Sequence, residues 1–137
     1  MNAPTIDELI AHPAVGAELA AWADSLPGDP ARRHEEGGWS YFNPTQNHIQ
    51  TRRSSVGGRA YLDLDDPPEL AGYFVIATYH THPNPASDGW DTGPSRQDTE
   101  SAHALGVPCI IRAEDGVHTT GPSARRGGLT GKPGFPD

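Results

Sequence analysis

Residues 72–81 constrain the fold more than any other part of the sequence, because almost every residue in this run favours a β-strand. These residues are aromatic or β-branched: Tyr73, Phe74, Val75, Ile76, Thr78 and Tyr79. Both faces of such a strand are largely apolar, which is typical of a strand covered on both sides by other elements. The sequence therefore predicts a covered β-sheet with this strand at its centre.

Two helices are predicted before this strand. Thr5 and Glu8 form a capping-box pair that starts the first helix. Pro13 kinks that helix or opens a second one, which ends at the Pro-Gly-Asp-Pro turn at 27–30.

A third helix is predicted after the central strand, from the N-cap Ser95 to about Leu105, with Gly106 in the left-handed position that ends it. Shorter strands are predicted at 39–42, 49–53, 60–64, 107–112 and 117–120. The Asp-Gly turn at 115–116 joins the last two into a hairpin.

The length and composition fit one α/β domain. A chain of 137 residues suits a single core, and its 16 glycines and 14 prolines indicate many turns without reaching the level typical of disorder. We expect this domain to span residues 1–122. Residues 123–137, which are mostly Gly, Pro and Arg with little to bury, are expected to form a mobile tail.

The charge balance argues against two classes of partner. Ten Lys and Arg against eighteen Asp and Glu give a net charge of −8, so no basic surface is expected for nucleic acid or for an anionic membrane. Residues 1–31 contain no Lys or Arg, and no apolar run is long enough to cross a bilayer. We therefore expect a soluble, cytoplasmic protein. Its single cysteine, Cys109, is expected to be a small buried group.

The central strand runs directly into the sequence His-Thr-His-Pro at 80–83. Residues two apart on a strand point to the same face, roughly 6.6 Å apart along the chain, so the imidazoles of His80 and His82 can converge on one ion. On its own, a His-x-His pair more often consists of ordinary polar residues at the end of a strand than of metal ligands.

An acid on the next helix adds a third candidate ligand. Ser95 and Asp98 are one helical turn apart and face the same way, although a Ser N-cap followed by an acid is also ordinary helix capping. Together, the two histidines and Asp98 would supply three Zn²⁺ ligands and leave a fourth position for water.

A catalytic zinc site also needs a group that moves protons, and Glu35 is the candidate. Glu35 and Glu36 precede Gly37 and Gly38 and a predicted strand. The glycines would let the backbone approach a substrate or metal closely. Successive strand residues point to opposite faces, so only one of the two acids can address the site.

In this order, Glu-x-x-Gly, His-Thr-His-Pro and Ser-x-x-Asp resemble the signature of the JAMM, or MPN-plus, zinc metalloproteases. The resemblance covers Glu35 to about Thr120 and is strongest to compact bacterial JAB-domain proteins, with which the Glu-Gly-Gly-Trp and Gly-Val-Pro stretches also agree.

The resemblance implies a mixed sheet with flanking helices, and a zinc ion held by His80, His82, Asp98 and a water. It also implies Glu35 as general base and acid, with Ser95 helping to stabilise the oxyanion. Members of this family cleave ubiquitin-like proteins from lysines or trim peptide tails. A protein or peptide substrate, including a ubiquitin-like one, is therefore expected, and the oligomeric state is left open.

Three alternatives stay open. The segment between Pro83 and Ser95 is longer than is usual in the family, so Asp88 or Asp91 could replace Asp98 as a ligand. Trp90, expected to be exposed in that segment, could contact an extended substrate or pack locally. Finally, the chain could be a catalytically silent MPN-like domain that binds a protein partner.

Overall fold

The structure is a computed structural model that describes residue 4, residues 6–11 and residues 16–122. Its helices are α1 (Ile6–Ala11), α2 (Ala17–Ser25) and α3 (Arg96–Leu105), with short 3-10 turns η2 (Pro30–Arg32) and η3 (Ala86–Asp88). Its strands are β1 (Gly37–Asn43), β2 (His48–Arg53), β3 (Phe74–His82), β4 (Cys109–Ala113) and β5 (Gly116–Thr120). The helix start at Thr5, the role of Pro13 and the tail at 123–137 lie outside the described residues.

The strands form one mixed sheet in the order β2-β1-β3-β4-β5. β3 is central, as predicted, and pairs antiparallel with β1 and parallel with β4. The other pairs, β1 with β2 and β4 with β5, are antiparallel. The chain therefore folds as a single small α/β domain, and the elements predicted at 39–42, 49–53, 107–112 and 117–120 are confirmed with small shifts of their ends.

The strand predicted at 60–64 is wrong, because this segment lies in the irregular connection between β2 and β3. This connection is held in place by side chains of β1 and not by backbone pairing with a neighbouring strand. Trp39 Nε1 donates to the Leu64 carbonyl at 2.9 Å, and the Tyr41 hydroxyl donates to the Pro68 carbonyl at 2.6 Å. Pro67 and Pro68 have no N–H to offer to a sheet ladder.

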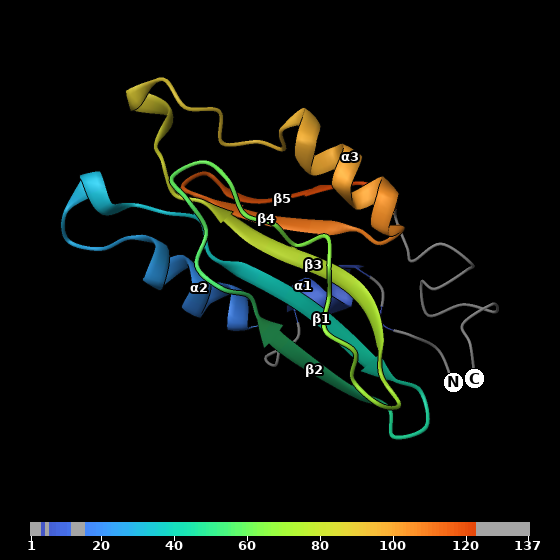
Figure 1. Cartoon of the computed structure of the whole chain (residues 1–137). Coiled ribbons are helices and arrows are strands. Elements are labelled where there is room, and N and C mark those ends of the chain that lie inside the picture. The colour runs from blue at the N-terminus through green and yellow to red at the C-terminus, as the bar shows by residue number, and fades with distance from the viewer. Residues whose placement is uncertain (1–3, 5, 12–15, 123–137) are drawn as a thin grey trace.

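Helices cover both faces of the sheet, as Figure 1 shows. On one face, Ala21 of α2 packs in a buried cluster with Tyr79 of β3 and Ile110 of β4. On the other face, Ala102 of α3 packs against Cys109 and Ile111 of β4. Alternate residues of the same strands thus face different helices, which places His80 and His82 on the opposite side of β3 from Tyr79.

Helix α3 begins and ends where the sequence predicts. The side chain of Ser95 accepts from the Asp98 N–H, and Gly106 adopts φ 78° after the last turn. The central strand predicted at Gly72 to Thr81 is observed as β3, which begins two residues later, at Phe74, and ends one residue later, at His82. In the described part of the chain, no helix is long and apolar enough to cross a membrane.

Candidate metal centre

The two histidines of β3 point their Nε2 atoms toward each other. These atoms are 3.1 Å apart, and the ring centroids are 5.0 Å apart. The His80 side chain is 5% exposed and that of His82 is 11% exposed. Strand alternation therefore brings both rings to one buried point, as the spacing predicts.

Asp98 reaches this point from the first turn of α3. Its Oδ1 atom lies 3.2 Å from His80 Nε2, and its Oδ2 atom lies 3.1 Å from His82 Nε2. The ligand atoms around a tetrahedral zinc ion with bonds near 2.0 Å are about 3.3 Å apart. The two Nε2 atoms have nearly this separation, and each lies at a similar distance from a different oxygen of Asp98. The donor set and its spacing fit a zinc ion.

The ion pairs of Asp98 control its charge and that of His80. Burial opposes ionisation of the Asp98 carboxyl, but hydrogen bonds with His80 and His82 hold its pKa well below its usual value. Burial alone would lower the pKa of His80, yet its contacts with Cys109 and Asp98 raise that pKa well above its ordinary value. In the metal-free protein, the centre is therefore a buried ion-pair cluster.

Glu35 lies at the edge of the same cluster, just before β1. Gly37 pairs with His80 across the β1–β3 ladder, which brings the preceding acid alongside the histidine. Glu35 Oε1 is 4.0 Å from His80 Nε2, and burial raises the pKa of its carboxyl.

Glu35, His80 and His82 offer a second ligand set, whose atoms lie within 4.8 Å of one another. The Asp98 oxygens are closer to the histidines than Glu35 is, and the 4.0 Å gap at Glu35 exceeds the edge of a zinc tetrahedron. Asp98 is therefore the nearer of the two candidate carboxylates, and Glu35 completes, with the two histidines, the set in which one atom of each residue lies within 4.8 Å of the others.

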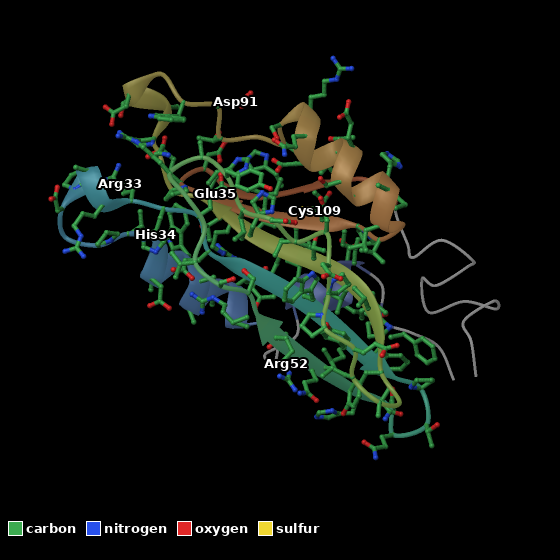
Figure 2. All side chains as sticks on the ribbon, in the orientation of Figure 1. Arg33, His34, Glu35, Arg52, Asp91 and Cys109 are labelled. Atoms are coloured by element: carbon green, nitrogen blue, oxygen red, sulfur yellow. The ribbon has the colours of Figure 1, made fainter. Side chains whose placement is uncertain are left out.

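Glu36 has different partners. Its carboxylate contacts His34 Nε2 at 2.6 Å and Arg53 Nη2 at 3.1 Å. Figure 2 shows His34 on the α2 side of Glu35. Added side chains at Gly37 and Gly38 would collide with backbone of β3 and β2, respectively. The missing side chains at these glycines therefore allow close strand packing, and at Gly37 they let β1 approach His80 itself.

Ser95 is exposed and serves as the N-cap of α3. Its Oγ atom accepts from the Asp98 N–H at 3.0 Å, and its own N–H donates to Asp98 Oδ2 at 2.9 Å. A hydroxyl that accepts through its oxygen still has its O–H to donate. Ser95 thus holds Asp98 in place, and its O–H is not used by these two bonds.

Cys109 is a member of the centre that sequence reasoning missed. Its buried Sγ atom lies 3.4 Å from His80 Nδ1, the ring nitrogen on the opposite side from the one that contacts Asp98. The parallel pairing of Thr78 with Cys109 makes this contact, and no local sequence signal reveals that pairing. His82 Nδ1 is buried and has no hydrogen-bond partner among the described residues.

A cavity of about 240 Å³ opens over this centre. Its walls come from residues 60–65 of the β2–β3 connection and from the loop and helix at 90–105, and Cys109 is also part of its lining. Figure 2 shows Asp91 on the loop beyond Glu35 and Cys109. Asn84 also lines the cavity, and its Nδ2 donates to the carbonyl of Arg59, just before the first wall, at 2.9 Å.

The alternative ligands and Trp90 are part of this loop. Asp88 and Asp91 are exposed, and neither forms an ion pair with the two histidines within the described residues. Trp90 is half-buried rather than exposed, because the Arg59 guanidinium lies 5.6 Å from its ring centroid. It lines the cavity and also packs locally.

Comparisons of the chain with known protein families, with curated proteins and with solved structures found no match.

Proposed function

We propose that this protein is a zinc-dependent metallopeptidase of the JAMM type that hydrolyses an amide or isopeptide bond. The observation that carries this proposal is the convergence of His80 Nε2, His82 Nε2 and the Asp98 carboxylate at 3.1–3.2 Å, with a buried acid beside them and a cavity above. The sequence motifs that resemble the JAMM signature fall on these same residues.

His80, His82 and Asp98 would hold the zinc ion. A bound zinc ion polarises a substrate carbonyl and lowers the pKa of a water toward 7. Glu35 then takes a proton from the attacking water at its carboxylate and returns it to the leaving nitrogen as the carbon–nitrogen bond breaks. Its raised pKa suits this exchange, because a buried carboxylate binds a proton more readily than an exposed one.

Ser95 would donate its O–H to the oxygen on which negative charge develops. A positioned donor of this kind stabilises the tetrahedral transition state more than the planar substrate. The products are a carboxylic acid and an amine.

The proposed substrate is a polypeptide, and the composition of the cavity walls supports this choice. They combine large apolar side chains, including Tyr61 and Trp90, with the polar metal centre at the base. A largely apolar cavity suits the side chains of a peptide better than a compact, highly charged metabolite. A ubiquitin-like tail or an unstructured peptide meets this description.

A cleavage screen tests the proposal. Zinc-loaded wild-type protein and Glu35→Gln are incubated with ubiquitin-like fusion proteins and with unstructured peptides, and products are identified by mass spectrometry. We expect cleavage by the wild type and a loss of roughly 10²- to 10⁴-fold in Glu35→Gln. Equal rates in both proteins would exclude the assigned role of Glu35. Binding of a ubiquitin-like protein without cleavage would instead identify a silent MPN-like binding domain.

A further inference from the structure

The backbone of Glu35 is held on both sides by a turn at Gly57 and Gly58. The Glu35 N–H donates to the Gly58 carbonyl at 2.8 Å, and the Gly57 N–H donates to the Glu35 carbonyl at 3.0 Å. This pair of bonds joins the segment before β1 to the connection after β2.

The next residue is anchored to β3 in the same way. The Glu36 N–H donates to Thr81 Oγ1 at 3.1 Å, and the Thr81 N–H donates to the Glu36 carbonyl at 3.0 Å. The Glu35 side chain, by contrast, is 8% exposed, and its carboxylate has longer contacts: Oε1 lies 4.0 Å from His80 Nε2, and the ligand atoms of Glu35, His80 and His82 lie within 4.8 Å of one another. Its short hydrogen bonds are therefore those of its backbone, which fix the point from which the side chain reaches the histidines.

Position 57 has no room for a side chain. A Cβ atom at Gly57 would lie 2.5 Å from the Tyr61 carbonyl oxygen and 2.8 Å from the Glu35 carbonyl oxygen. At Gly58, the nearest atom to an added Cβ is the Tyr61 oxygen at 3.8 Å, an ordinary contact. Neither glycine has a positive φ. The difference between these neighbours is therefore one of space.

We propose that Gly57 is a positioning residue for Glu35, and that its missing side chain is what lets the turn hold the acid against the metal centre. This inference rests on the proposed role of Glu35. The Gly58 N–H also donates to the Tyr61 carbonyl at 2.7 Å, so the turn that holds the acid continues directly into the cavity wall. The wall that would contact a substrate and the group that moves the proton thus belong to one hydrogen-bonded unit.

The experiment compares Gly57→Ala with its matched control, Gly58→Ala, in zinc-loaded full-length protein. Gly57→Ala is expected to lower kcat by about 10- to 100-fold with little change in KM, because displacing a catalytic group by about 1 Å costs rates of this order. Zinc affinity should stay within about threefold of wild type, since none of the proposed ligands moves, and Gly58→Ala should behave like wild type.

A double-mutant cycle separates positioning from a general loss of structure. If Gly57 acts through Glu35, adding Gly57→Ala to Glu35→Gln lowers kcat no further. Multiplicative losses, or an equal loss in Gly58→Ala, would overturn the proposal.

Amide hydrogen exchange tests whether the turn at Gly57 and Gly58 holds Glu35, and it needs no substrate. A failure to find a cleaved substrate would count against the proposed function alone. In the wild type, the Glu35 amide should exchange as slowly as amides of β3, and in Gly57→Ala it should exchange at least tenfold faster. An unprotected Glu35 amide in the wild type, or unchanged protection in Gly57→Ala, would overturn the inference. The wild-type measurement also decides the matter if Gly57→Ala does not fold.

Discussion

Asp98 contacts His80 and His82 with different oxygens, at 3.2 and 3.1 Å, while the same carboxylate accepts the N–H of Ser95. One side chain thus connects the start of α3 to the end of β3. Ion pairs hold this buried cluster, and the proposed zinc site would use the same side chains. Its behaviour with pH and with zinc should therefore differ in ways that can be measured.

Zinc is expected to stabilise the protein more at higher pH. Because contacts with Cys109 and Asp98 raise the pKa of His80, the protonated imidazole stabilises the metal-free fold at low pH, and this contribution is lost as pH rises through that raised pKa. Zinc needs the neutral imidazole, so its binding improves over the same range. The difference in Tm with and without zinc, measured between about pH 5.5 and 8, should widen with pH. A constant difference would count against a histidine-ligated site.

Glu35→Gln is expected to stabilise the metal-free protein. Burial raises the pKa of Glu35 above 4.5, so the ionised form destabilises the fold increasingly as pH rises above that value. Removing this charge should increase the free energy of unfolding by about 1 kcal/mol at pH 7, and by less at pH 5, in denaturant titrations.

Glu36→Gln is the matched control for this substitution. Glu36 is equally buried but is paired with His34 and Arg53, so its loss should destabilise the protein by about 2 kcal/mol. The same sign for both variants would contradict the different environments of these neighbouring acids.

Cys109→Ala is expected to weaken zinc binding about tenfold, as loss of an outer partner of a metal-binding histidine commonly does. The Cys109 sulfur contacts His80 Nδ1 and so orients the ring whose Nε2 faces Asp98. Cys109→Ser keeps a hydrogen-bonding atom and should restore most of the affinity. Competition with a chelator measures both constants, and wild-type affinity in the alanine variant would exclude this role.

Ser95 can be separated into its two roles by two substitutions. Ser95→Ala removes both the cap and the donor, and should lower stability by about 1 kcal/mol. Both Ser95→Ala and Ser95→Asp lack the hydroxyl, so both should cleave about 10²-fold more slowly than wild type. Ser95→Asp keeps a capping oxygen, so its stability should return toward that of wild type. If Ser95→Asp recovers the full rate, Ser95 acts through the helix alone.

The sequence predicts those parts of the fold that depend on local patterns. The strand-favouring run before His80 and the capping pair at Ser95 and Asp98 both specify their elements within a few residues, and both were found where expected. The segment at 60–64 has a short alternating pattern like that of a strand, but two prolines follow it and side chains of β1 hold it outside the sheet.

The candidate site is predictable only where its residues belong to linear motifs. Cys109 and Gly57 lie far in sequence from His80 and Glu35, and they meet them through a parallel strand pair and a turn. Such long-range pairings depend on the whole sheet, and no periodicity within either segment encodes them.

Calorimetric titration of the metal-free protein with zinc tests the central claim most directly. The account predicts one zinc ion per chain, with binding lost in His80→Ala and in Asp98→Ala. Asp91→Ala should bind like wild type, because Asp91 lines the same cavity without contacting either histidine in an ion pair within the described residues. A wild-type protein that takes up no zinc, or full affinity in Asp98→Ala, would contradict the account.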